Sequence, residues 1–209
     1  MFSFSHIKSH LIAPLKKAAI VITLLALTAC TATTRKMVIA PDISHIKSNI
    51  YALKTADVKV MDLRPNNHVV AIHREGEAIE LISAHDHLDS IITSLFTQTL
   101  SNNGLTVDDN TTNNAVISND SANNIELIIN TAEVHVYQEL MKYKTTSQLT
   151  LTAKVISGDK TLTKTFNNKG KSNGVLSADL AVLERNFNQQ ISDTIALIIN
   201  DSEIKQFIQ

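Results

Sequence analysis

The strongest constraint on the fold is a run of alternating apolar and polar side chains in residues 143–156. The apolar members of the run are Tyr143, Leu149, Leu151, Ala153 and Val155, and the polar members are Lys144, Gln148, Thr150, Thr152 and Lys154. Successive side chains of a β-strand point to opposite faces of the sheet, so a period of two predicts a strand with one buried face. Such a strand is typical of an antiparallel or mixed sheet that is covered on one side only.

Further strand patterns lie on both sides of this run. They cover residues 36–40, 57–62, 68–73, 78–83, 105–107, 125–137 and 161–167. Residues 74–77 form a hairpin turn in which Gly76 supplies a positive φ. A second turn is predicted at 157–160, and the glycine-containing residues 169–174 are predicted to close the meander as a turn. We therefore expect about five to seven strands.

Two long amphipathic helices are also predicted. Apolar side chains recur at spacings of three and four in residues 84–103, and Gly104 stands where a C-terminal cap belongs. The same spacing recurs in residues 177–200. Ser177 is the predicted N-cap of this second helix, and Asp179 is favoured by the positive end of the helix dipole.

Runs of strands beside two long helices predict an α+β fold, with an antiparallel or mixed β-sheet and both helices packed on one face. Residues 201–207 are predicted to add a short helix that presents Ile204 and Phe207. We expect residues 37–209 to form a single domain of this kind. The asparagine-rich residues 108–124 show no period that would bury a face, and they are predicted to form a mobile surface loop.

Residues 1–29 have the order of a secretory signal peptide. Three lysines precede the uncharged apolar run at 18–29, and small residues lead up to Cys30. The apolar run has 12 residues, whereas a helix that crosses a bilayer needs about 20. A retained membrane span is therefore the weaker interpretation.

The sequence Leu-Thr-Ala-Cys at residues 27–30 resembles the bacterial lipobox. The resemblance implies cleavage between Ala29 and Cys30, a diacylglycerol on the cysteine sulfur, and a further acyl chain such as palmitate on its amine. One acyl chain binds a membrane marginally, at about 0.8 kcal/mol per buried methylene, so three chains would make a lasting anchor. Thr31 takes the place of the aspartate that retains such proteins in the inner membrane of enteric-type bacteria. An ordinary signal peptide followed by an unrelated cysteine remains the alternative.

Charge and cysteine content exclude several classes of function. The full chain has 19 basic and 20 acidic residues, and removal of the three leader lysines leaves 16 basic residues and a net charge near −4. No cluster of lysine and arginine provides a footprint for nucleic acid. Cys30 is the only cysteine, so no disulfide can form within the chain. A lipid on its sulfur would also exclude a cysteine nucleophile and a cysteine-based metal site. Residues 30–36 are expected to be a lipidated polar tether.

Over residues 57–209 the chain resembles the YajG-type family of uncharacterised bacterial outer-membrane lipoproteins. The features that carry the resemblance are the Cys30 lipobox, the hairpin before the 84–103 helix, the hairpin at 158–160, and the ending Ser192-Asp193-Thr194-Ile195-Ala196 followed by Asp201, Ile204, Phe207 and Ile208. The expanded loop at 108–124 and the long leader depart from the family pattern. The resemblance implies a lipid-anchored domain on the outer membrane, facing the periplasm, and implies no chemistry.

The most metal-like cluster is His85, Asp86 and His87, with His68, His73 or His135 as further candidates from elsewhere in the chain. Residues two apart diverge on a helix but share a face on extended backbone. The alternative is a polar first helical turn with Asp86 near the positive end of the dipole. We predict no metal site and no cofactor.

Three other groups of residues are candidate sites. Asp62 and Arg64 are two apart at a strand end, where an exposed ion pair contributes at most about 1 kcal/mol. The carboxylates Glu75, Glu77 and Glu80 surround a turn, and acid–base catalysis would need a cleft that separates their pKa values. Tyr137, Tyr143 and Phe166 could form an aromatic patch, with Phe166 in the core and the two tyrosines at an exposed binding edge. Neither a catalytic motif nor a cofactor-binding motif is present.

The leading hypothesis is a non-enzymatic outer-membrane lipoprotein whose periplasmic domain binds an envelope protein partner or supports envelope assembly and maintenance. The alternative is a periplasmic ligand-binding module for lipid or glycan fragments, with a groove between helix and sheet. A periplasmic enzyme without a recognisable motif is a third hypothesis. Contact with the membrane is assigned to the lipid on Cys30, and no nucleic acid is expected as a partner.

Overall fold

The computed structural model describes residues 35–44, 50–52, 54–108 and 123–208. The leader, the Ala29–Cys30 junction, most of the tether and nearly all of the asparagine-rich loop lie outside these residues. The elements in chain order are β1 (Lys36–Met37), β2 (Lys54–Asp62), β3 (His68–Arg74), β4 (Glu80–Ala84), α2 (Leu88–Asn102), β5 (Leu105–Asp108), β6 (Asn123–Gln138), β7 (Lys142–Ser157), β8 (Lys160–Val175), α3 (Leu180–Asn200) and α4 (Ser202–Phe207).

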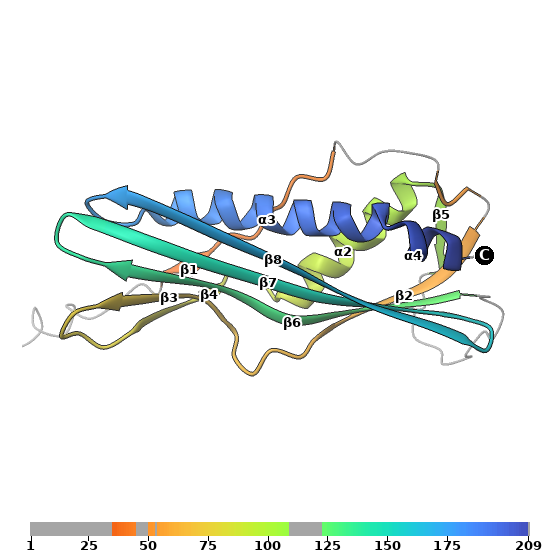
Figure 1. Ribbon diagram of the computed structural model, residues 1–209, viewed down its shortest axis with the longest axis horizontal. Coiled ribbons are helices and arrows are strands. Elements are labelled where there is room, and N and C mark those ends of the chain that lie inside the picture. Colours follow the sequence, from red (N-terminus) through yellow and green to blue (C-terminus); the bar gives the residue numbers. More distant parts are fainter. Residues whose placement is uncertain (1–34, 45–49, 53, 109–122, 209) are drawn as a thin grey trace, which may run out of the picture. The chain divides into compact units, whose positions relative to one another are not determined.

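These strands form one mixed, eight-stranded sheet in which β6 is the central strand (Figure 1). One edge of β6 pairs antiparallel with β7, and β7 pairs antiparallel with β8. The other edge of β6 pairs in parallel with two strands in succession, first β2 and then β3. β5 extends the sheet beyond β2, while β4 and then β1 extend it beyond β3. The register of β6 against β7 shifts between Ile129 and Thr131. Near the same point, the parallel partner on the other edge of β6 changes from β2 to β3.

The predicted alternation in β7 is confirmed. Leu149, Leu151, Ala153 and Val155 are at most 1 % exposed, and the intervening side chains are half-buried on the other face. The buried side of β6 follows the same period, and these residues join α2 and α3 in a single apolar core. Figure 1 shows α2, α3 and α4 along the same side of the long strands, as the one-sided pattern predicts.

The helices begin later than the sequence predicts. α2 starts at Leu88 rather than at residue 84, because residues 80–84 pair in β4 and His87 keeps an extended backbone. α3 starts at Leu180, and its N-cap is Asp179, which accepts a hydrogen bond from the Ala181 N–H at 3.0 Å. The prediction of Ser177 as the cap is therefore wrong. None of the described helices is both long and apolar enough to cross a membrane.

Two strand predictions also need correction. Residues 169–174, predicted as a turn, belong to β8, which continues in register with β7 to Val175. The predicted strand at 36–40 shortens to Lys36–Met37, because the backbone N–H groups of Val38 and Ala40 donate to Glu184 and Asn188 of α3. Eight strands thus exceed the predicted five to seven, while the two long helices and the short helix after residue 201 are present.

Candidate functional site

The histidines that look metal-like in the sequence do not come together in one cluster in the structure. His85, Asp86 and His87 lie exposed between β4 and α2, outside any helical turn. His73 and His135 lie on adjacent strands, with 3.1 Å between His73 Nε2 and His135 Nδ1. Among the residues that the structure describes, no group of three histidine, cysteine, aspartate or glutamate side chains could hold a metal ion.

Asp62 and Arg64 form a structural pair rather than an exposed one. The Arg64 side chain is only 7 % exposed, and its Nη2 lies 2.8 Å from Asp62 Oδ2. The guanidinium also donates to the carbonyl oxygens of His68 and Ala132, each at 3.3 Å. Arg64 therefore ties together the strand ends at the point where β6 changes partners.

The carboxylates around the β3–β4 turn are exposed or paired. Arg74 Nη1 lies 2.9 Å from Glu80 Oε2 and 3.7 Å from Glu77 Oε2. Glu75 and Glu77 are exposed at the turn, and Gly76 has the expected positive φ of 73°. Water screens charges at such a turn, which is not the enclosed cleft that paired carboxylates need for acid–base catalysis.

The predicted exposed tyrosine pair is wrong. Tyr143 pairs with Gln138 across the ladder, so it lies on the face opposite to that of Tyr137. Tyr143 is half-buried, and its ring covers Gly174, where any Cβ atom would collide with it. Tyr137 is exposed on the uncovered face of the sheet, and Phe166 packs against the core as predicted.

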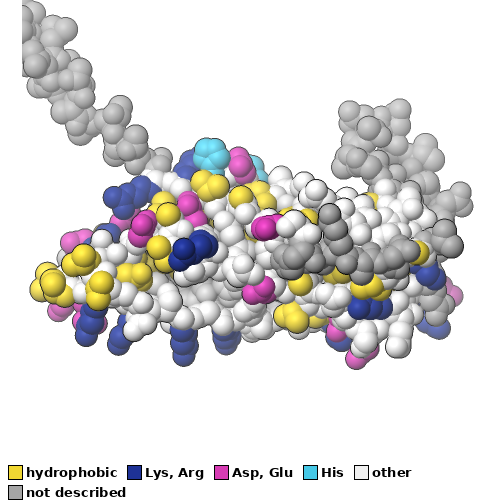
Figure 2. Space-filling model, turned by 90° about the horizontal axis from the view of Figure 1, so that it is seen from above, with side chains coloured by type: hydrophobic (Ala, Val, Ile, Leu, Met, Phe, Trp, Pro, Cys, Tyr) yellow, Lys and Arg dark blue, Asp and Glu magenta, His cyan; other side chains and the backbone are white. Residues whose placement is uncertain are grey.

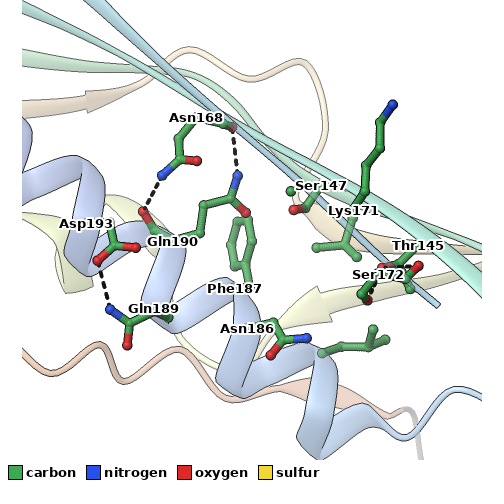
Figure 3. A pocket seen from close by; sticks show the side chains of 13 residues that line it. Thr145, Ser147, Asn168, Lys171, Ser172, Asn186, Phe187, Gln189, Gln190 and Asp193 are labelled. Atoms are coloured by element: carbon green, nitrogen blue, oxygen red, sulfur yellow. Dashed lines mark hydrogen bonds between the residues drawn. The ribbon is translucent and has the colours of Figure 1, made fainter. Parts of the chain in front are cut away.

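A groove of about 350 Å³ lies between α3 and the covered face of β7 and β8. Its walls are mainly small or polar side chains, among them Thr145, Ser147, Asn168, Ser172, Asn186 and Gln190 (Figure 3). The core ends here, because the covered side of the hairpin changes from bulky apolar residues to threonine, serine, asparagine and glycine. Leu183 and Phe187 of α3 give the groove its buried apolar surface.

Hydrogen bonds fix the two sides of the groove to each other. Gln190 Nε2 donates to the Asn168 carbonyl oxygen at 2.7 Å, and Asn168 Nδ2 donates to Thr194 Oγ1 at 3.2 Å. Figure 3 shows Asn168 of β8 and Gln190 of α3 facing each other and joined by two hydrogen bonds. Farther out on α3, Gln189 Nε2 donates to Asp193 Oδ1 at 2.8 Å. The polar walls are thus held in place before any ligand arrives.

Several polar atoms in the groove have hydrogen-bonding capacity to spare. Among the described residues, none bonds to Asn168 Oδ1, Gln190 Oε1, the Ser147 hydroxyl or the Asn186 carboxamide. Among the described residues, none of these groove atoms is a fully buried atom without a hydrogen-bond partner. The spare groove atoms therefore face solvent and are open to a ligand.

Part of the β7 sequence indicates this groove, but it is hard to recognise because it lies within the alternating pattern of the strand. Thr145 and Ser147 occupy the apolar side of the β7 period, yet neither is apolar. Gly170 and Ser172 lie opposite them on β8, in the stretch predicted as a turn. A Cβ atom on Gly170 would lie 2.5 Å from Ser147 Oγ, so the present position of the Ser147 hydroxyl depends on glycine at residue 170.

A second feature is an apolar end of the β6–β8 meander, which we call the hairpin tip and define as Leu140, Met141, Val175 and Leu176. These side chains are 98 %, 70 %, 78 % and 61 % exposed. Figure 2 shows hydrophobic side chains gathered at the end of the molecule where Figure 1 places the β6–β7 turn. Contiguous exposed apolar residues of this kind mark interaction sites.

The hairpin tip is held rigidly. Gln138 Nε2 donates to the carbonyl oxygens of Leu176 and Glu139, each at 2.7 Å, and Gln138 Oε1 accepts from the Ala178 N–H at 3.1 Å. The Leu176 N–H donates to the Met141 carbonyl oxygen at 2.9 Å. Leu176 has a φ of 63°, a conformation that costs a leucine about 1 kcal/mol or more. These bonds fix Leu176 in a conformation that leaves its side chain exposed.

The opposite end of α3 carries a network of charges. Asp201 caps α4 by accepting from the Glu203 and Ile204 N–H groups, and Lys164 Nζ lies 2.7 Å from its Oδ2. Burial opposes the charge on Asp201, but the Lys164 and backbone hydrogen bonds outweigh it and lower the pKa of Asp201. The hydrogen bond to Asp201 raises the pKa of Lys164. This network joins β8 to α4 and is structural.

A family model described as "Uncharacterized lipoprotein" matches residues 41–209. The chain belongs to this family. The match confirms the YajG-type resemblance seen in the sequence, and it covers every described element from β2 onward. No curated protein matches this lipoprotein.

Among solved structures, the lipoprotein is similar to a crystal structure of a protein from Xanthomonas campestris. The TM-score is 0.54 at 11 % identity, over 83 % of this chain and 93 % of that chain. A lipoprotein from Neisseria meningitidis matches with a TM-score of 0.29 at 13 % identity, over 67 % of this chain and 99 % of the other. The first likeness shows a shared fold.

Proposed function

We propose that this lipoprotein is anchored in the outer membrane by acyl chains on Cys30, faces the periplasm, and is a non-enzymatic docking domain for an envelope protein. The anchor is supported by the lipobox in the sequence and by membership of a lipoprotein family. The absence of catalysis is supported by the carboxylates of the β3–β4 turn, which are exposed or paired with Arg74.

The hairpin tip is the observation that carries the docking role. Leu140 is 98 % exposed, and Val175 is 78 % exposed on the strand beside it. Side chains this apolar gain free energy when a partner covers them, at about 25 cal/mol per Å² of apolar surface. Because Gln138 already fixes the backbone of the tip, little conformational entropy is lost on binding.

The charges beside the hairpin tip favour a protein over a lipid surface. Glu139 and Lys142 flank the turn and pair with each other, with 3.1 Å between Glu139 Oε2 and Lys142 Nζ. An apolar centre with a polar, charge-balanced rim is the usual anatomy of a protein interface. Recognition of an anionic bilayer uses clusters of about four or more unpaired lysines or arginines, and the turn itself has none to spare.

Site-specific photocrosslinking in intact cells tests this function. A photoreactive amino acid at Leu140 should give one dominant protein adduct, and the same group at Asp159 should not. Asp159 is a matched control, because it is exposed in the turn at the other end of β7. Replacement of Met141 by serine should weaken the adduct formed at position 140. Adducts with lipid alone, or equal adducts at both positions, would rule the docking role out.

A further inference from the structure

We propose that the groove between α3 and the β7–β8 hairpin binds a neutral saccharide. The inference stands apart from the docking role of the hairpin tip, because it rests on different residues and on a different chemistry. Its volume of about 350 Å³ lies within the range of small-molecule pockets, which begins at about 300 Å³. The groove is open, and its walls are already held together by the Asn168–Gln190 hydrogen bonds.

The spare hydrogen-bonding groups match hydroxyl groups best. A sugar hydroxyl both donates and accepts, and a carboxamide offers an acceptor oxygen and donor N–H bonds from one planar group. Asn186 has its whole carboxamide free among the described residues, while Asn168 and Gln190 each have a free carboxamide oxygen. Ser147 adds a hydroxyl that can take either role. These groups provide donors and acceptors in one site.

The charges around the groove disfavour an anionic ligand. Of the charged residues beside it, Lys171 extends its side chain away from the cavity (Figure 3). Asp193 turns its carboxylate to Gln189, whose Nε2 lies 2.8 Å from Asp193 Oδ1. A carboxylate or phosphate would bind most strongly to fixed cations, and none faces the cavity among the described residues. The groove is thus built for a ligand without charge.

Two other ligand classes fit the groove less well. An acyl chain needs a mostly apolar pocket, whereas apolar contact here comes chiefly from Phe187 and Leu183 at the base. An extended peptide is usually recognised by the backbone groups of a strand edge. The free groups here are instead side-chain carboxamides and a hydroxyl, so an extended peptide would leave them without partners. Phe187 offers the apolar contact against which the face of a sugar ring can pack.

Calorimetric titration of the full-length protein, in a detergent without a sugar headgroup, tests the inference. The probes are maltotriose and the β-1,4-linked trisaccharide of N-acetylglucosamine, both uncharged. We expect saturable binding at millimolar concentrations for at least one of them. The Asn186→Ala variant should weaken binding about threefold to tenfold, as expected for the loss of one hydrogen bond.

Asn200→Ala is the matched control, because Asn200 is an exposed carboxamide on the same helix and does not line the groove. It should leave the dissociation constant unchanged. Asn186 is exposed as well, so its variant keeps the fold, and thermal unfolding checks this. No saturable binding of either trisaccharide would overturn the inference. Binding of an uncharged blocked tripeptide in place of the sugars, with the same dependence on Asn186, would also overturn it.

Discussion

At the scale of single residues, Arg64 is a charged side chain that the fold largely buries. It lies where β6 leaves β2 and takes up β3, and its guanidinium satisfies the carbonyl oxygens of His68 and Ala132. Of the residues that the structure describes, only Asp62 balances its charge, through contacts of 2.8 to 3.2 Å. The sequence predicts this pair from its spacing, but the burial of Arg64 depends on strands that lie far apart in the chain.

We expect Asp62→Asn to lower the free energy of unfolding by about 3 kcal/mol, because it leaves a largely buried cation without a counter-charge. Glu139→Gln is the matched control, since it breaks an exposed ion pair and should cost less than about 1 kcal/mol. Urea unfolding of both variants measures the difference. Equal effects would mean that Arg64 needs no counter-charge at this position.

Tyr51 is a second residue whose contribution to stability can be measured. Its hydroxyl donates to the Ile199 carbonyl oxygen at 2.8 Å, and the side chain is 1 % exposed. Burial, with the nearby Asp201 charge second, raises the pKa of Tyr51 to about 12 from its usual 10.0. The folded state therefore holds this proton more tightly than the unfolded state does. The resulting stability is complete below pH 10 and is lost as the pH rises toward 12.

Tyr51→Phe should cost about 1 kcal/mol at neutral pH through the lost hydrogen bond. The difference between the wild type and this variant should shrink above pH 10, because the phenylalanine protein has no proton to lose at this position. Urea unfolding at a series of pH values measures it, with Tyr137→Phe as the exposed control. A difference that stays constant up to pH 11 would show that the Tyr51 pKa is not raised.

At the scale of elements, β7 and β8 show how far a sequence pattern can be trusted. The period of two in β7 predicts a strand because each buried position from Leu149 to Val155 carries an apolar side chain. β8 has no such pattern beyond Phe166, and its glycines are typical of turns. Pairing with β7 makes this stretch a strand. Tyr143 of β7 fills the space above Gly174, and Ser147 of β7 fills the space above Gly170. For the same reason, the sequence suggests a groove between helix and sheet, as the ligand-binding alternative requires, but does not predict the β8 residues that line it.

Gly174→Val should therefore destabilise the end of the β7–β8 hairpin. The added side chain would displace the Tyr143 ring, and overpacking of this kind costs about 1 to 3 kcal/mol. The double variant Gly174→Val with Tyr143→Ala should recover part of that loss, because the space is then free. Thermal unfolding of the two proteins gives the comparison. If removal of the Tyr143 ring restores no stability, the destabilisation by Gly174→Val does not come from a collision with that ring.

At the scale of the whole molecule, the fold joins strands that are distant in the chain. β6 pairs in parallel with β2 and β3, and local periodicity carries no information about which strand such a pairing will select. Composition and spacing therefore predict a sheet covered by two long helices, but not its order. The proposed anchor is the opposite case, because the signal that predicts it is confined to consecutive residues and needs no tertiary structure to be recognised.

That local signal gives the last prediction, which concerns where the protein resides. Cys30→Ala removes the sulfur that would carry the diacylglycerol, so we expect either an uncleaved precursor or a soluble form, and loss of incorporated palmitate. Thr31→Asp is the control: it keeps the sulfur, so acylation should persist while the protein shifts toward the inner membrane. Membrane fractionation and mass spectrometry of the native N-terminus measure both. Since one acyl chain binds only marginally, a Cys30→Ala protein that stayed fully in the outer membrane would require another anchor.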